Sequence, residues 1–174
     1  MRKVTFGGAN SLDSFIARKN GEVDWVIWNK EVQAISREFW QTIDTVVMGR
    51  KTYDVAAKVG SGVYPGVKNY VFSRTLKNGS NKSIQIVSED ATEFLRRLKQ
   101  EPGKGICVIG GGLLARSLFE ANLIDEIGFN IHPVLLGSGV PLFLEMTRQI
   151  DLELLECKTV GNGCVVVRYK VISI

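Results

Sequence analysis

Apolar and polar positions follow two different periods along this chain. Several short runs, beginning with residues 2–6, are rich in apolar and β-branched residues and end at glycine or polar positions, which is typical of buried strands. The segment 29–42 has a helical period instead. Within it, Val32, Ile35 and Phe39 recur at the spacing of one helix face. The change of period predicts that strands and helices alternate.

The middle of the chain predicts a mostly parallel sheet with helices on its faces. Buried strands are predicted at residues 45–48, 70–72, 84–87 and 105–109. Helices are predicted between them at residues 50–57, 90–100 and 112–121. Either Ser88 or Asp90 can serve as the N-cap of the second of these helices. Regular alternation of this kind favours an α/β fold.

The C-terminal part predicts an antiparallel edge, with strands at 126–131, 152–160 and 164–171. A two-residue turn at Asn162-Gly163 would pair residue 161 with 164 and 157 with 168. Cys157 and Cys164 would then not face each other, so we expect no disulfide between them. With one histidine, His132, and no Cys-x-x-Cys spacing, we expect no metal site either.

Composition narrows the class of protein. A chain of 174 residues with 45% hydrophobic and 23% charged residues is expected to form a single folded domain, residues 1–174. The 22 basic and 18 acidic residues give a net charge of +4, but no basic run occurs, which argues against nucleic acid. No apolar run reaches the length of a membrane span or a signal h-region, so the cytoplasm is the expected location.

Candidate chemistry begins where the strand 45–48 ends. The strand is followed by a glycine, two cations and a hydroxyl: Gly49, Arg50, Lys51 and Thr52. Glycine lets backbone N–H groups approach a ligand, and the cations and hydroxyl at a helix start suit a phosphate. We therefore predict an anion-binding turn at this position.

Two further turns repeat this design. Ser73-Arg74-Thr75 follows the strand 70–72 and suits the 2′-phosphate that distinguishes NADPH from NADH, although a solvated turn is an equal alternative. The third turn follows the strand 105–109 and suits a pyrophosphate at a helix start: Gly110, Gly111, Gly112, Leu113 and Leu114. The alternative there is a tight turn in which glycine serves the backbone alone.

Three residues are candidates for the substrate side. Asp13 and Asp24 could hydrogen-bond an amino-heterocycle, and Asp13 is the candidate for a catalytic group. Trp25 could form one wall of a pocket for a flat ring. The alternatives are a turn-forming Asp13 and a core Trp25. For His132, which precedes a proline at a strand end, packing is favoured over catalysis.

These motifs resemble the dihydrofolate reductase superfamily, and more closely the reductase domain of the bifunctional riboflavin-biosynthesis deaminase-reductase and its stand-alone relatives. The segment 11–17 is similar to that domain's S-L-D-G-x-I-A, with Ser14 in place of the glycine, and the segment 21–25 is similar to the G-x-x-D-W of the stand-alone members. The remaining matching segments are 48–53, 72–74, 108–112 and 133–143. The resemblance covers nearly the whole chain.

The resemblance implies a three-layer, dihydrofolate reductase-like α/β fold, whose mostly parallel sheet of about eight strands has flanking helices and an antiparallel C-terminal hairpin. It implies NADPH as cofactor, with Ala9 meeting the nicotinamide amide through its backbone, and hydride transfer to a flat heterocycle. It also implies a cis peptide between Gly110 and Gly111. Finally, it implies a homodimer that joins through the C-terminal strands.

Two positions differ from the relatives. Dihydrofolate reductase proper carries an acid sixteen residues before the glycine of its M-G-R segment, where Gln33 stands here, and the riboflavin reductase domain has a glutamate where Ile109 stands. The expected activity is therefore an NADPH-dependent reductase of a pteridine-, pyrimidine- or flavin-like ring, similar to 5-amino-6-(5-phosphoribosylamino)uracil reductase or dihydrofolate reductase. The alternative is a non-catalytic, NADPH-binding homodimer.

Overall fold

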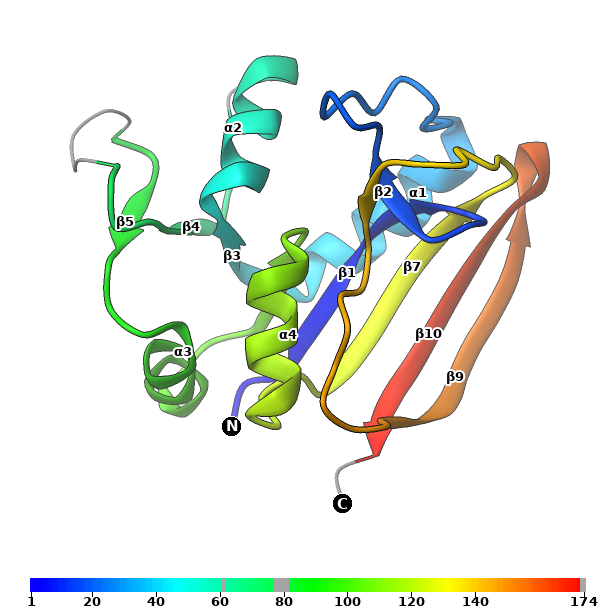
Figure 1. Ribbon diagram of the computed structural model, residues 1–174. Helices are drawn as coiled ribbons and strands as arrows, with labels where there is room; N and C mark the ends of the chain where they lie inside the picture. Colours follow the sequence, from blue (N-terminus) through cyan, green and yellow to red (C-terminus); the bar gives the residue numbers. More distant parts are fainter. Residues whose placement is uncertain (61, 77–81, 173–174) are drawn as a thin grey trace.

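The computed structural model of the protein describes residues 1–60, 62–76 and 82–172. Eight strands form one sheet in the spatial order β5-β4-β3-β6-β1-β7-β10-β9 (Figure 1). Their bounds are β1 Val4–Ser11, β3 Ile43–Gly49, β4 Lys68–Phe72, β5 Gln85–Val87, β6 Gly105–Ile109, β7 Glu126–His132, β9 Asp151–Val160 and β10 Cys164–Ile172. Two shorter strands, β2 Phe15–Ala17 and β8 Val140–Pro141, pair with each other.

The six strands from β5 to β7 run parallel, and β10 and β9 complete the sheet as an antiparallel edge. This confirms the predicted α/β class and the mixed, mostly parallel sheet. β1 lies between β6 and β7, with Val4 opposite Ile106 and Thr5 opposite Glu126. β1 extends beyond its predicted end at residue 6 to Ser11, because Gly7 pairs with both β6 and β7 and residues 8–11 continue the pairing with β7.

Helices cover both faces of the sheet: α1 Lys30–Gln41, α2 Arg50–Val59, α3 Ala91–Gln100 and α4 Gly112–Glu120. Leu98 of α3 and Leu118 of α4 pack on one face in a core cluster with Phe6. On the other face, Phe39 of α1 packs against a cluster that contains Val46. No helix in the described part of the chain is long and apolar enough to cross a membrane.

The β9–β10 hairpin differs in register from the prediction. A three-residue turn, Gly161–Gly163, joins the strands, so Val160 pairs with Cys164 and residue 157 with 167. The two-residue turn is wrong because α1 holds Gly161 out of the ladder: the Gly161 N–H donates to Glu31 Oε2, and its carbonyl accepts from Asn29 Nδ2 at 3.0 Å. The two cysteines of the hairpin are free, as expected.

Candidate functional site

The carboxyl ends of β4, β3 and β6 lie next to one another because these strands are parallel neighbours. Each predicted phosphate turn starts at one of them: Gly49 ends β3, Ser73 follows β4 and Gly110 follows β6. The first and third turns are in contact. A Cβ atom built on Gly111 would lie 3.9 Å from the backbone N of Gly49 and 3.5 Å from Oγ1 of Thr52.

Two helices begin at this edge without a side-chain cap. The N-cap residue of α2 is Gly49 and that of α4 is Gly111, and neither helix start has a side-chain capping hydrogen bond. α1 and α3 differ, because Asn29 and Asp90 accept hydrogen bonds from N–H groups of the first turn. The starts of α2 and α4 therefore present N–H donors and the positive ends of two helix dipoles, which together favour an anion.

The glycine turn before α4 is built by two consecutive left-handed residues. Gly110 has φ 55° and Gly111 has φ 71°, a conformation that glycine adopts at little cost. The peptide between them is trans, as are all peptide bonds of the described residues, so the implied cis peptide is wrong for this structure. The positive φ values of Gly110 and Gly111 turn the chain into α4 without a cis peptide.

The polar side chains around these turns fall into two groups. Arg50 donates from Nε to Oδ1 of Asp54 at 2.7 Å, and the Oγ of Ser73 accepts the N–H of Leu76 at 3.0 Å. Lys51 and Arg74 are exposed and form no ion pair within the described residues. The latter two side chains are thus free to meet an anionic ligand.

The remaining predicted positions of the third turn belong to the start of α4. Gly112 packs closely, since a Cβ there would lie 2.9 Å from Cγ of Leu144. Leu113 is 69% exposed, whereas Leu114 belongs to the core. A ligand at this turn can therefore contact Leu113 without disturbing the core.

A cavity of about 720 Å³ lies between α1 and the sheet, and Ala9 of β1 lines it. The helix side has an apolar row of Val32, Ile35 and Phe39 together with two polar residues of α1, Ser36 and Glu38, and Trp28 lies beside it. The sheet side is different in character, because it carries glycines and polar groups: Lys3, Gly7, Glu126, Gly128, Asn130 and Arg168. The volume suits a small-molecule ligand.

Asp13 does not line this cavity; it holds a neighbouring loop. Its Oδ1 accepts the N–H of Leu136 at 3.1 Å, and its Oδ2 accepts the N–H of Gly137 at 2.7 Å. The hydroxyl of Ser11 donates to Oδ1 at 2.6 Å. These hydrogen bonds, the one from Ser11 above all, hold the pKa of Asp13 below its usual range. The carboxylate is ionised and already has three donors.

Asp24 and Trp25 also lie outside the cavity lining. Asp24 forms a two-point contact with Arg18, with Nε to Oδ1 at 2.7 Å and Nη2 to Oδ2 at 3.2 Å, and this contact lowers the pKa of Asp24. Trp25 is 9% exposed and packs edge-on against His132, with ring centroids 5.4 Å apart. The indole that does line the cavity is that of Trp28, which is 61% exposed.

His132 is fully buried beneath the segment that precedes α1. Its Nδ1 accepts the N–H of Ile27 at 3.1 Å, so the neutral ring carries its proton on Nε2. Nδ1 also lies 3.5 Å from Sγ of Cys164. Burial lowers the pKa of His132. The ring joins β7 to the segment from which Trp28 reaches the cavity.

The polar floor of the cavity is the part of the site that the sequence reading missed. Its members include Glu126, Asn130 and Arg168. A signal for it is present in β7, where polar or glycine residues alternate with Ile127, Phe129 and Ile131. A strand with one apolar and one polar face shows this period of two. The polar face is the one that α1 covers.

Comparison with known proteins places this geometry in a family. The chain matches the RibD C-terminal domain over residues 2–166. The uncharacterized protein YyaP of Bacillus subtilis (strain 168) is 34% identical over 180 residues, covering 97% of this chain and 94% of that protein. YwjB of the same organism, also uncharacterized, is 37% identical over 165 residues, covering 93% and 94%.

Solved structures of similar fold agree with this family assignment. A protein assigned to riboflavin biosynthesis from Shewanella sp. PV-4 superposes with a TM-score of 0.85 and 26% identity, over 99% of this chain and 100% of that one. Dihydrofolate reductase from Enterococcus faecalis, complexed with NADP(H), superposes with a TM-score of 0.73 and 16% sequence identity, over 98% of this chain and 97% of that one. The Thermotoga maritima deaminase/5-amino-6-(5-phosphoribosylamino)uracil reductase superposes with a TM-score of 0.72 and 14% sequence identity, over 98% of this chain and 57% of that one. The fold is thus dihydrofolate reductase-like, and the chain belongs to the RibD C-terminal domain family.

Proposed function

We propose that this protein is an NADPH-dependent reductase that transfers a hydride to a heterocyclic substrate. The observation that carries the proposal is the meeting of two uncapped helix starts, at Gly49 and Gly111, at the strand ends beside a cavity that Ala9 lines. Paired helix N-termini suit a pyrophosphate, and a lined cavity suits a ring. Membership of the RibD C-terminal domain family supports the same activity.

The residues at the strand ends fit a dinucleotide phosphate. The first-turn N–H groups of α2 and α4 would hold the pyrophosphate, with Lys51 beside them. Arg74, which has no ion pair within the described residues, would meet the 2′-phosphate, and the hydroxyl of Ser73 keeps that turn in shape. Ala9 would meet the nicotinamide amide through its backbone. The bound nicotinamide supplies the hydride, and this chain binds and orients it.

The cavity under α1 would hold the substrate ring. Val32, Ile35 and Phe39 offer apolar contact to a flat heterocycle, and the exposed indole of Trp28 offers a face for stacking. The Thermotoga maritima relative is named for a reductase of an aminouracil. We infer a pteridine-, pyrimidine- or flavin-like ring for the present chain.

A specific observation favours a second candidate, a non-catalytic NADPH-binding homodimer. The α1 residues that line the cavity are Val32, Ile35, Ser36, Glu38, Phe39 and Trp40, and Gln33 is not part of the lining. The lining therefore has no carboxylate at the position of the acid in dihydrofolate reductase proper, and the carboxylate that α1 does contribute, Glu38, is exposed to solvent. A protein that binds the cofactor but does not reduce a substrate would need no acid at this position.

Either protein would form a homodimer through β9, in our proposal. β9 is the outer strand of the sheet (Figure 1). Three leucines on it, Leu152, Leu154 and Leu155, are 40%, 56% and 45% exposed. Clustered exposed apolar side chains on an edge strand favour a contact with another chain.

Calorimetric titration of the protein with NADPH and, in parallel, with NADH tests the cofactor. We expect tight NADPH binding and much weaker NADH binding; failure to bind either would overturn the proposal in both of its forms. Loss of NADPH absorbance is then followed with oxidised pteridines, pyrimidines and flavins. Saturable oxidation with one ring class supports the reductase, and binding without turnover of any of them supports the non-catalytic module.

A further inference from the structure

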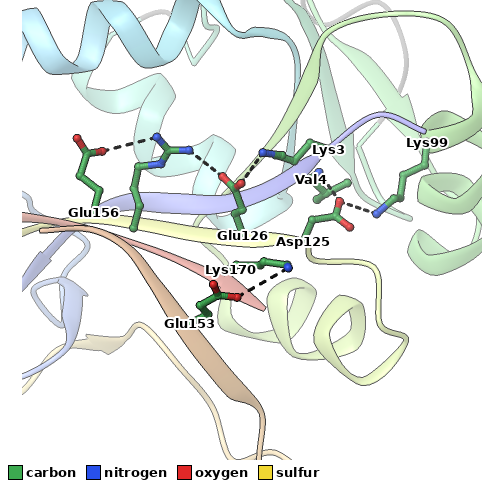
Figure 2. A network of polar contacts seen from close by, with 9 residues as sticks. Lys3, Val4, Lys99, Asp125, Glu126, Glu153, Glu156 and Lys170 are labelled. Carbon is green, nitrogen blue, oxygen red and sulfur yellow. Dashed lines mark hydrogen bonds and ion pairs between the residues drawn. The ribbon is translucent and has the colours of Figure 1, made fainter. Parts of the chain in front are cut away.

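The end of the cavity farthest from the carboxyl ends of the parallel strands contains a chain of ion pairs. Glu126, which begins β7, accepts from Lys3 Nζ at 2.5 Å and from Arg168 Nη2 at 2.9 Å. Arg168 Nη1 lies 3.6 Å from Oε2 of Glu156, which also pairs with Lys158. Figure 2 shows Glu126 between its partners, with Lys3 on one side and Glu156 farther along. All five residues line the cavity.

Glycines leave this network open to the cavity. Gly128 faces the network from β7, and a Cβ there would meet Cγ of Arg168 at 3.5 Å and Cγ2 of Thr5 at 3.9 Å, which are ordinary contacts. A larger side chain at residue 128 would enter the space between them. Gly7, beside it on β1, has no room for a Cβ, which would lie 2.7 Å from the carbonyl O of Gly128.

The network is an unusual structure for a sheet face that a helix covers. The side chain of Glu126 is 7% exposed, and burying a carboxylate has a desolvation cost that its ion pairs only offset. Two groups of the same floor still lack a hydrogen-bond partner within the described residues: Nε of Arg168 and Oδ1 of Asn130. Stability alone gives a poor account of such an arrangement, which points to a ligand.

The charges of the lining balance. Three cations, Lys3, Lys158 and Arg168, are matched by three carboxylates, Glu38, Glu126 and Glu156. A phosphate placed here would gain the cations but would also meet Glu126 and Glu156. A hydroxyl group both donates and accepts, and so it can bond to carboxylate and guanidinium alike without changing the net charge.

We propose that the substrate ring carries an uncharged, hydroxylated side chain, which lies along the sheet past Gly128 and hydrogen-bonds to the Glu126–Arg168–Glu156 network. This inference rests on the proposed function, because it takes the ring site under α1 as given. It assigns the network a role in selecting the substituent and leaves the ring to Trp28 and the apolar row of α1.

Three flavins that differ only in the substituent test this. Lumiflavin has a methyl group, riboflavin an uncharged polyol and FMN the same polyol with a phosphate. Quenching of flavin fluorescence, with NADP⁺ present, gives the three affinities. We expect riboflavin to bind roughly tenfold more tightly than lumiflavin, as two or three hydrogen bonds would give, and FMN to bind more weakly than riboflavin. The pteridine comparison uses 6-methylpterin and neopterin.

Variants test whether the Glu126–Arg168–Glu156 network causes the tighter binding of riboflavin. Gly128→Val should remove the advantage of riboflavin and leave lumiflavin binding in place, and Glu126→Gln should reduce the advantage. Glu153→Gln, in an exposed pair with Lys170 outside the cavity, is the matched control and should keep it. Circular dichroism establishes that each variant is folded.

Four results would overturn the inference: equal affinities for lumiflavin and riboflavin, tighter binding of FMN, an unchanged preference in Gly128→Val, or no binding in either ring series. NADPH titration of the same samples separates this failure from failure of the proposed function. If the inference alone is wrong, NADPH still binds. If the proposed function is wrong in both of its forms, NADPH binding is absent as well, and if the reductase form alone is wrong, NADPH binds but no ring oxidises it.

Discussion

Gly110 lies directly against the side chain of Thr52, so the last residue of the first predicted phosphate turn contacts the first residue of the third. A Cβ built on Gly110 would stand 2.8 Å from Oγ1 and 2.9 Å from Cγ2 of Thr52. Both distances are shorter than real Cβ contacts, so a larger residue at 110 requires a shift of the Thr52 side chain or of the start of α2. The two helix starts keep their relative positions because residue 110 has no side chain.

Gly110→Ala is therefore expected to destabilise the fold and to weaken NADPH binding. The left-handed φ of 55° costs an alanine roughly 1 kcal/mol, and the contact with Thr52 adds to it. Urea unfolding and calorimetry measure the two effects. Gly66→Ala is the matched control, because Gly66 has φ 78° but nothing within 4 Å of its Cβ position. Equal losses in the two variants would show that the Thr52 contact contributes nothing.

Arg74→Ala should weaken NADPH far more than NADH. It removes a charge-assisted contact with the 2′-phosphate, which is worth about 1.5 to 3 kcal/mol, or roughly tenfold and more in affinity. Arg96→Ala is the control, since Arg96 pairs with Glu93 on the surface of α3. Equal loss for both cofactors would mean that Arg74 does not read the 2′-phosphate.

Glu126 should make stability depend on acid pH. Burial alone would raise the pKa of Glu126, but the hydrogen bonds and charges of Lys3 and Arg168 outweigh it and hold the pKa below its usual range. The stabilisation is thus complete above the unfolded pKa of about 4.3 and is lost as the pH falls through the lower folded value.

Glu126→Gln tests this dependence by urea unfolding at a series of pH values. We expect a loss of about 1.5 to 3 kcal/mol near neutral pH and a flatter acid limb than in the wild type. Glu153→Gln is again the comparison, because exposed pairs contribute about 0 to 1 kcal/mol. A variant with the wild-type acid limb would place the titrating group elsewhere.

His132 should make the free energy of unfolding depend on pH in a range nearer to neutrality. Its folded pKa is lowered by burial, so the stability it contributes is present above the unfolded pKa of about 6.5 and is lost as the pH falls through the folded value. Protonated Nδ1 could no longer accept the N–H of Ile27. His132→Gln should remove this slope from the free energy of unfolding. The sequence has one histidine, so persistence of the slope would contradict the assignment.

The proposed dimer gives a test that is independent of ligands. Leu154→Lys should convert a dimer to monomers in sedimentation velocity, because a buried lysine at an apolar contact is costly. Leu135→Lys is the control, since Leu135 is 71% exposed in the loop that follows β7 and is not part of β9. Sedimentation of the wild-type protein as a monomer at high concentration would contradict the proposed homodimer.

Much of the fold follows from local pattern. The buried strand at residues 105–109 and the helix face of Val32, Ile35 and Phe39 were predicted because their apolar periods are strong. The hairpin register was not, because it depends on contacts of Gly161 with Glu31 and Asn29, far away in sequence. Local turn preferences cannot include such a contact.

The site divides in the same way. The three turns at the strand ends could be recognised because each lies within a few consecutive residues that follow a strand, and their binding of phosphate stays a prediction. The cavity floor was not, because Lys3, Glu126 and Arg168 become neighbours only through the pairing of β1, β7 and β10. The hydrogen bonds of Asp13 to a loop more than a hundred residues away could not be predicted either, for the same reason.

The central position of β1 has a consequence for biosynthesis. This strand is synthesised before its two partners, β6 and β7, which are completed only at residues 109 and 132. At about 5 to 20 residues per second, an apolar strand with two open edges waits roughly 6 to 24 s for the second of them. The nascent chain is therefore most prone to aggregation before β7 is made, and holdase chaperones that bind β1 would raise the yield of folded protein.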